Sequence, residues 1–534
     1  MKKNKPILLI VIGIITVILI ILLFFANSFV KNKIEALLQN NIPDHIENSY
    51  ESISVNVLGG TVSLNELSLQ IKLKDSSLIQ TKAIMKSFTI AGVSYWDYIF
   101  NDEIHVGSIK FEDLQLEYYK DHKNKPKDSI EGEKPIELPK AIIIDNINFE
   151  NTAVSIFDKS KDSTFLYSKN INVAIEDILL NESTLLQKIP IKYGDVSIQT
   201  DSIFFKTGIY EDLFVNHLEI ENNNITLKDI HFKTKYSKTE LSKIITKERD
   251  HLNIKVDEFK INNLDFGFEN DSLFVKSNLI SINKTDAAFY RDKLVADDYK
   301  LKNLYSKSLR ELPIKLTIDS VSIVNSKVEY SEKGHPENPA GVLTISNLNG
   351  GVSNLSNTYS SPEKTTIYVE AIFMKNSPMD ATWSFDINQI NDAFTFVGHL
   401  GKLEASDMNV FIAPLINVKL EGEIIETYFD ITGDYNQSVI NISQDYDNIK
   451  VDIFNKKKKK RKALSEIANV FINDDSEVDG QIFHNVTANA SRDKTKSFFN
   501  YLARNLKSSL LIMFTKRNKS DKKKSKKHKG KKRN

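Results

Sequence analysis

The pattern that is typical of the chain is clearest in Ile144-Asp-Asn-Ile-Asn-Phe-Glu-Asn-Thr-Ala-Val-Ser-Ile156. Ile147 and Phe149 lie two positions apart before Asn151, and the alternation resumes after it at Val154. A period of two gives each arm one apolar and one polar face, as in a strand that is buried on one side. The stretch therefore predicts a strand, a tight turn at Asn151 and a second strand.

The same spacing occurs four more times along the chain. The copies begin at residues 106, 215, 256 and 318, and their central residues are Asp113, Asn222, Asn263 and Asn325. Asn and Asp suit a tight turn because they tolerate left-handed backbone conformations. The intervals between copies are too irregular for a strict solenoid. The chain is therefore predicted to be mainly β, with an elongated antiparallel sheet built hairpin by hairpin and few short helices.

A sheet with one apolar face must cover that face. The sheet either closes on itself as a sandwich or barrel, or curls into a groove whose apolar trough holds a ligand. Both solutions place one apolar residue of each copy on the inner face. The representatives chosen as candidates for a lipid groove are Phe111, Phe149, Ile220, Ile261 and Ile323.

The charge of the chain is strongly asymmetric although the net charge is +1. The runs 456–462 and 516–533 carry net charges of +7 and +11, which leaves −17 on the remainder. The chain is thus an acidic body with two basic appendages. Cysteine is absent, which excludes disulfides and thiolate metal sites and suits an oxidising compartment.

Residues 7–25 are uncharged and almost entirely apolar, and three lysines precede them. That length spans a bilayer core and exceeds the usual apolar region of a signal peptide. We expect a membrane anchor with a short cytoplasmic amino terminus and an exported body. The alternative is a signal peptide that is cleaved at Ala26-Asn27-Ser28.

A helix that is amphipathic is predicted near the carboxyl terminus. Its apolar stripe consists of Phe498, Leu502, Leu506, Leu510 and Phe514, with Asn500, Arg504 and Lys507 opposite. One interpretation is a helix that lies on an anionic membrane surface, assisted by the following lysines. The other is a helix that caps the sheet and is followed by a disordered tail. The lysine tail does not favour nucleic acid as a partner, because no aromatic residues are interleaved with it.

The sequence shows no catalytic, cofactor-binding or metal-binding motif. The ten histidines form no ligand pair at helical or strand spacing. The acidic cluster 475–480 lacks the Glu that a calcium loop needs at its twelfth position, since Val486 stands there. No phosphate-binding glycine loop or nucleophile elbow occurs. We expect a protein that is not an enzyme and holds no cofactor.

An amino-terminal membrane helix followed by these repeated units resembles the AsmA-like family of Gram-negative envelopes, which is related to TamB and the bridge-like lipid-transfer proteins. The resemblance covers residues 7–454. It includes the stretch 304–319, which looks like the entry to the family's second half. The segments 420–422, 429–433 and 446–451 look like its closing strands. The resemblance implies a β-groove with an apolar floor that takes part in lipid transport and outer-membrane biogenesis.

The sequence thus predicts an inner-membrane protein with a single span and a periplasmic body. Its function is to bind or convey the acyl chains of a phospholipid or other envelope lipid, with an envelope protein as a possible partner at the far end. The alternative is a structural or assembly factor with a dry β scaffold. The predicted parts are a cytoplasmic terminus at 1–6, a membrane helix at 7–26, a groove-forming body at 27–455, a basic run with a short helix at 456–480, the amphipathic helix at 497–515 and a disordered tail at 516–534.

Overall fold

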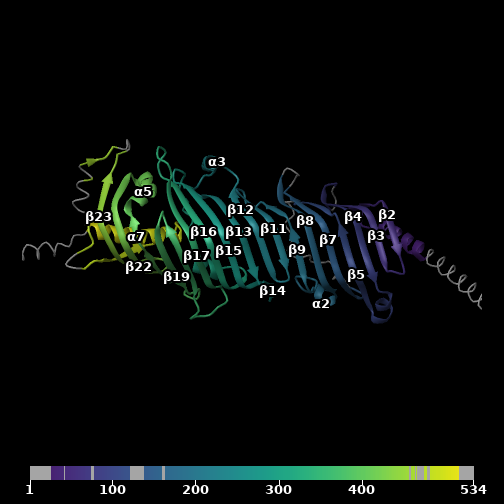
Figure 1. The fold of residues 1–534 in the computed structure, drawn as a ribbon. Helices are drawn as coiled ribbons and strands as arrows, with labels where there is room; N and C mark the ends of the chain where they lie inside the picture. The colour runs from purple at the N-terminus through teal and green to yellow at the C-terminus, as the bar shows by residue number, and fades with distance from the viewer. Residues whose placement is uncertain are drawn as a thin grey trace, which may run out of the picture. The chain divides into compact units, whose positions relative to one another are not determined.

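The computed structural model describes residues 26–40, 42–73, 77–120, 138–158, 163–455, 459–462, 465, 474–477 and 481–515. The chain divides into two compact units, Met1–Lys228 and Asp229–Asn534, here called the N-terminal and C-terminal units. Both are built mainly from β-strands that lie side by side (Figure 1). The prediction of a mainly β chain with few short helices is confirmed.

The N-terminal unit is a sheet in which split strands lie end to end along a common neighbour. Its strands are β1 (Ile46–Ser49), β2 (Ser52–Asn56), β3 (Thr61–Lys72), β4 (Ile79–Val93), β5 (Glu103–Glu112), β6 (Gln115–Tyr119), β7 (Ala141–Phe157), β8 (Thr164–Leu180), β9 (Val196–Thr200), β10 (Ser202–Phe205) and β11 (Glu211–Glu221). Both β1 and β2 pair with β3, which pairs with β4. The order then continues through β5 and β6, β7, β8, β9 and β10 to β11. The short helices η1 (Asp97–Asn101) and α2 (Glu182–Leu185) lie between strands along the chain, and residues 26–40 form a further helix.

The C-terminal unit continues the same architecture after β12 (Asn224–Thr234), which contains the division between the units. Its strands are β13 (Asp250–Asn262), β14 (Asp265–Glu269), β15 (Ser272–Asp292), β16 (Lys315–Lys333), β17 (Gly341–Ser356), β18 (Thr365–Phe373), β19 (Ser377–Phe385), β20 (Phe394–Leu400), β21 (Leu403–Glu404), β22 (Val418–Gly433), β23 (Gln437–Ile453) and β24 (His484–Ser491). Its helices are α3 (Lys238–Ile244), α4 (Tyr305–Arg310), η2 (Ala405–Met408), α5 (Asn409–Ile416) and α7 (Phe498–Thr515).

The prediction of a purely antiparallel sheet is wrong. β7 pairs in parallel with β5 and β6, and β16 pairs in parallel with β15. A parallel neighbour needs a long crossover, and the chain is long enough for one both between β6 and β7 and between β15 and β16. The second of these connections begins after Asp292 and contains the short helix α4.

The left-handed conformation predicted for the central residue of each repeat is confirmed at all five. The predicted hairpin turn is wrong at four of these five residues. Asp113, Asn151, Asn222, Asn263 and Asn325 have φ between 51° and 53°. Asn151 and Asn325 form bulges inside the continuous strands β7 and β16, where the register shifts. Asp113 and Asn263 interrupt strands that resume along the same neighbour. A bulge inserts an extra residue and so restores apolar side chains to one face, as a turn was expected to do. At Asn222 the chain does turn between two strands.

Several predicted segments lie outside the described residues. They are the membrane span 7–26 apart from Ala26, most of the basic run and short helix at 456–480, and the lysine tail at 516–534. None of the helices that the structure describes combines the length and the apolar character needed to cross a bilayer. The predicted helix at 497–515 is confirmed as α7.

Candidate functional site

An apolar row crosses the sheet of the N-terminal unit from β2 to β11. The register places one apolar side chain of each strand directly beside that of the next strand. The row, here called the N-terminal row, consists of Ile53, Leu64, Phe88, Phe111, Phe149, Val173, Ile198 and Ile220. Directly paired side chains share a face at about 5 Å. The predicted groove residues Phe111, Phe149 and Ile220 therefore belong to one continuous apolar stripe.

A second row strengthens this face two residues further along each strand. It consists of Val55, Val62, Ile90, Ile109, Ile147, Ile175 and Val196. Aromatic rings add to the first row at its centre, where Phe111 stacks on Phe149 with ring centroids 4.5 Å apart. The Phe88 ring lies 5.1 Å from that of Phe111. The parallel pairing of β5 and β7 is what brings the stacked rings together.

The cover of the N-terminal row changes along its length. Ile53 and Leu64 are buried and lie in a cluster against which Ile34 and Leu38 of helix 26–40 pack. From Phe149 to Ile220 the side chains are half-buried. Phe149, Val173, Ile198 and Ile220 help to line a hollow of about 340 Å³, together with polar neighbours such as Asn172. The cluster that helix 26–40 joins includes Phe149 among its partly buried neighbours but not Val173, Ile198 or Ile220.

A corresponding row in the C-terminal unit is fully buried towards its last strands. This C-terminal row consists of Ile261, Ile280, Val321, Val352, Ile367, Trp383, Phe396, Ile431, Ile440 and Ala488. Ile261 is half-buried, whereas Ile431 and Ile440 are 0% exposed. The fifth groove candidate, Ile323, lies in the neighbouring row between Ile282 and Gly350. The structure thus places two of the five candidates, Ile261 and Ile323, in adjacent rows of the C-terminal unit.

Helix α7 covers the buried end of the C-terminal row. Phe498 stacks on Trp383 with centroids 4.2 Å apart, and Phe514 packs edge-on against Tyr446 at 5.1 Å. The stripe proposed for a membrane surface, Phe498, Leu502, Leu506, Leu510 and Phe514, belongs to this core or packs against it. Figure 1 shows α7 beside β23, and α7 also packs on β24. This is the arrangement expected of a helix that caps the sheet, which was the second interpretation of the sequence.

A buried polar line on α7 fixes its position on the sheet. Tyr501, Asn505 and Ser509 follow one another at helical spacing and are at most 1% exposed. The Asn505 Oδ1 accepts a 2.8 Å hydrogen bond from the Ser438 hydroxyl on β23. A buried amide must find such partners, because its desolvation is otherwise uncompensated. The sequence analysis missed this line, although its spacing of four matches that of the apolar stripe.

A buried carboxylate ties the start of α7 to the strand connections of the same unit. The side chain of Glu248 is 1% exposed and lies 2.6 Å from the Lys293 Nζ and 2.9 Å from the Lys496 Nζ. The Lys496 Nζ also lies 2.8 Å from Asp297. Burial alone would raise the pKa of Glu248, but the hydrogen bonds from the two lysines outweigh it and lower that pKa. The network therefore holds Glu248 ionised and anchors the segment that precedes α7.

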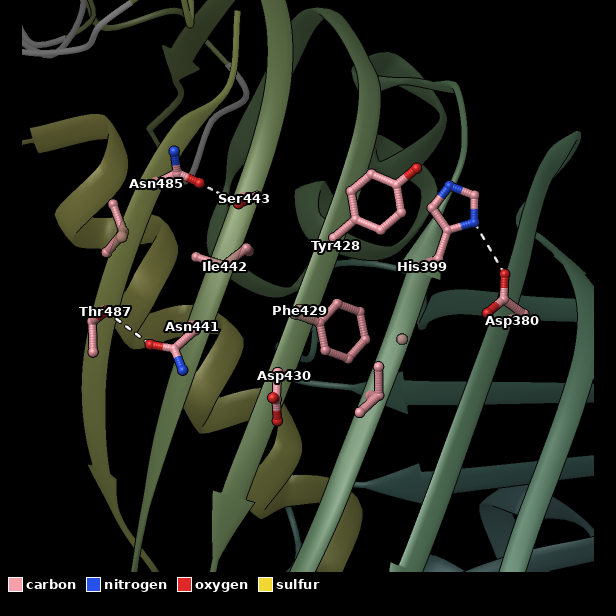
Figure 2. A pocket seen from close by; sticks show the side chains of 13 residues that line it. Asp380, His399, Tyr428, Phe429, Asp430, Asn441, Ile442, Ser443, Asn485 and Thr487 are labelled. Atoms are coloured by element: carbon pink, nitrogen blue, oxygen red, sulfur yellow. Dashed lines mark hydrogen bonds and ion pairs between the residues drawn. The ribbon is translucent and has the colours of Figure 1, made fainter. Parts of the chain in front are cut away.

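A hollow of about 600 Å³ lies over β20, β22, β23 and β24 in the C-terminal unit (Figure 2). Within it His399 contacts Asp380 at 3.0 Å and Glu426 at 3.2 Å, and its ring stacks on Tyr428. The hydrogen bond from Tyr428 lowers the pKa of Glu426, and His399 adds to this effect. These groups offer hydrogen bonds to a polar molecule.

The sequence showed His399 only as one of ten histidines that form no ligand pair at helical or strand spacing. The sequence analysis missed the cluster because Asp380 and Glu426 lie 19 and 27 positions away along the chain. In the part of the chain that the structure describes, no three His, Asp or Glu side chains are arranged to hold a metal ion.

Comparisons with known proteins identify no relative. No protein-family model matches the chain, and no curated protein matches it. The two apolar rows and the helices that pack on them are therefore the structural features that bear on the function.

Proposed function

We propose that this protein is a membrane-anchored envelope protein that binds or conveys lipid acyl chains along the apolar rows of its sheet. The observation that carries the proposal is the N-terminal row, which is continuous over eight strands and half-buried from Phe149 to Ile220. A sheet face that is apolar over such a length exposes surface to water at a cost of about 25 cal/mol per Å². An apolar ligand along the row removes that cost.

The dimensions of the N-terminal row suit an acyl chain. Neighbouring strands lie about 4.8 Å apart, so the five steps between the six half-buried members of the row, from Phe88 to Ile220, extend about 24 Å. The hydrocarbon core of a bilayer is about 30 Å thick, and each acyl chain occupies about half of it. The row is therefore long enough for an extended acyl chain. Each methylene buried there stabilises the complex by about 0.8 kcal/mol.

The cellular setting of the proposal comes from the sequence. The apolar segment at 7–25 provides the inner-membrane anchor, and the exported body then lies in the periplasm of a Gram-negative bacterium. The resemblance to AsmA-like proteins supports the same setting and an envelope lipid as the ligand. Protease added to spheroplasts should then digest the body while an amino-terminal tag stays protected. A body that survives until lysis would refute this orientation.

A second candidate function is a dry scaffold for envelope assembly. The buried end of the C-terminal row favours it, because Ile431 and Ile440 are inaccessible to any ligand while α7 is in place. The two candidates differ in what the half-buried part of the N-terminal row contacts in the cell. A scaffold predicts water or protein there, and a lipid groove predicts acyl chains.

The test is to place a photo-crosslinking residue at Phe149, Ile198 or Ile261 of the full chain in cells. Lipid adducts are expected at all three positions. Gln199 and Val439 are matched controls, because both are exposed neighbours of row residues on the opposite face. Mass spectrometry of lipids retained by the purified protein would identify the lipid. The absence of adducts at all three row positions would leave the scaffold as the better account.

A further inference from the structure

The connection between β4 and β5 exposes an unusual concentration of large apolar side chains. Tyr95, Trp96, Tyr98, Ile99 and Phe100 are each between 50% and 68% exposed, and Leu58 on the adjacent β2–β3 turn is 75% exposed. We call these six residues the aromatic end, because they lie where the strands of the N-terminal unit end. Soluble proteins rarely expose a contiguous apolar patch without a partner for it.

The segment that carries these exposed side chains makes specific contacts of its own. The Tyr95 hydroxyl donates to the Val57 carbonyl at 2.8 Å, and the Lys140 Nζ lies 3.9 Å from the centre of the Tyr98 ring. Asp97, between the exposed rings, accepts a hydrogen bond from Asn101 at 2.6 Å. The rings of Trp96 and Phe100 pack on each other at 4.2 Å. The sheet thus presents these apolar side chains outward from a fixed base.

The chain enters the unit at this same place. The side-chain oxygen of Asn27 accepts a 2.8 Å hydrogen bond from the backbone of Val57, which is also the partner of Tyr95. Asn27 lies two residues after the apolar segment 7–25. Phe29, two residues further on, is 65% exposed. The chain that follows the proposed anchor therefore lies beside the aromatic end.

We propose that the aromatic end rests in the interface of the bilayer that the anchor enters. The inference rests on the proposed anchor and deepens it by naming a second membrane contact. Trp and Tyr favour the level of the lipid headgroups, where their rings are buried and their polar groups stay hydrated. Lys31 and Lys33 follow the anchor closely and suit anionic headgroups at the same level. With two contacts, the strands are held at a fixed angle to the membrane and the adjacent end of the N-terminal row lies next to the lipids.

The experiment uses the absence of cysteine from the chain. Ile99→Cys in the full chain is labelled with an environment-sensitive fluorophore and reconstituted into phosphatidylethanolamine–phosphatidylglycerol vesicles. Ile209→Cys is the matched control, because Ile209 is 74% exposed in the β10–β11 connection at the opposite ends of the strands. We expect a blue-shifted emission at residue 99 and several-fold stronger quenching by nitroxide-labelled lipid than at residue 209. Substituting the exposed Trp96 and Phe100 by Ser should reduce the quenching.

Two results would overturn the proposal. Equal quenching at residues 99 and 209 would show that the aromatic end does not contact lipid. A blue shift at residue 99 without quenching would show that a protein surface covers it. Both results are separable from the proposed lipid groove, because crosslinking at Phe149 reports on acyl chains in the row whether or not residue 99 contacts the bilayer.

Discussion

The N-terminal and C-terminal rows are built by the same rule and differ in their cover. In both, the register places one apolar residue per strand beside the next. Ile198 remains half-buried, whereas Ile440 is 0% exposed because α7 packs over its neighbours. The alternation along each strand therefore determines which face of the sheet is apolar. In the C-terminal unit, the helix that follows the last strand then covers that face. The C-terminal unit therefore covers the end of its own row with α7, whereas the N-terminal unit leaves part of its own row half-buried.

The largest effect expected from this comparison comes from placing a charge in each row. Ile440→Asp buries an unpaired carboxylate in a sealed core, which costs several kcal/mol. Ile198→Asp leaves the carboxylate partly hydrated, so its cost should be about 1 kcal/mol. Thermal unfolding of the full chain, followed by calorimetry, measures both. Ser197→Asp and Val439→Asp control for the added charge on the exposed face. Equal losses in Ile198→Asp and Ile440→Asp would contradict an open row.

A second prediction compares the buried ion network of the C-terminal unit with a more exposed one in the N-terminal unit. Lys496→Met leaves the buried Glu248 with Lys293 alone and should destabilise the C-terminal unit by about 1–3 kcal/mol. Lys110 contacts Glu112 and Glu150 in the N-terminal unit, but its side chain is 35% exposed. Lys110→Met should therefore cost less than Lys496→Met, because solvent screens the ion pairs of Lys110. Denaturant unfolding of the two variants distinguishes these values, and a smaller loss for Lys496→Met would argue against the anchoring role of Glu248.

A third contrast concerns the buried polar line on α7. Asn505→Ala removes the acceptor for the Ser438 hydroxyl and should cost about 1–3 kcal/mol. Asn500 lies on the exposed side of the same helix, so Asn500→Ala should change stability by less than about 0.5 kcal/mol. Limited proteolysis after β24 provides a local readout, because a loosened α7 exposes the chain there. Similar cleavage in both variants would show that Asn505 does not position the helix.

The sequence predicted the apolar face better than the connections between strands. The alternation around Asn151 correctly placed Phe149 on the apolar face, and Asn151 adopts the expected left-handed conformation. A hairpin turn and a bulge both require one such residue and both restore the apolar face, so local pattern cannot distinguish them. Asn222 is followed by Asn223 and does form the turn.

The partners of an element were not predictable from its own residues. The spacing of Phe498 and Leu502 located α7 but could not decide between a membrane and the sheet as the surface that it covers. The stacking of Phe111 on Phe149 depends on a crossover between two strands, which period-two alternation does not encode. His399 was likewise unpredictable, since its carboxylate partners come from other strands.

The smallest expected effect is a difference in pH dependence between the two units. In the N-terminal unit, the hydrogen bonds that the His105 ring donates to Asp145 and then to Asp97 raise the pKa of His105 above its usual 6.5, against the effect of burial. A raised pKa means that the charged His105 stabilises the folded state fully below about pH 6.5, and that this contribution is lost as pH rises through the higher folded value. The contribution of Glu248 to stability changes with pH in the opposite direction. Its lowered pKa gives stability above its usual 4.5, which is lost as the pH falls through the lower folded value.

Because Asp97 lies between Trp96 and Tyr98 of the aromatic end and contacts His105 on β5, raising the pH should loosen residues 94–102 first. Amide hydrogen exchange, corrected for the intrinsic pH dependence of the rate, should show protection there falling as the pH rises above 6.5. His105→Gln should remove this dependence while leaving that of the C-terminal unit unchanged. If the wild-type chain and His105→Gln lose protection equally over this range, the loosening does not come from His105, and the base of the aromatic end is held by its other hydrogen bonds.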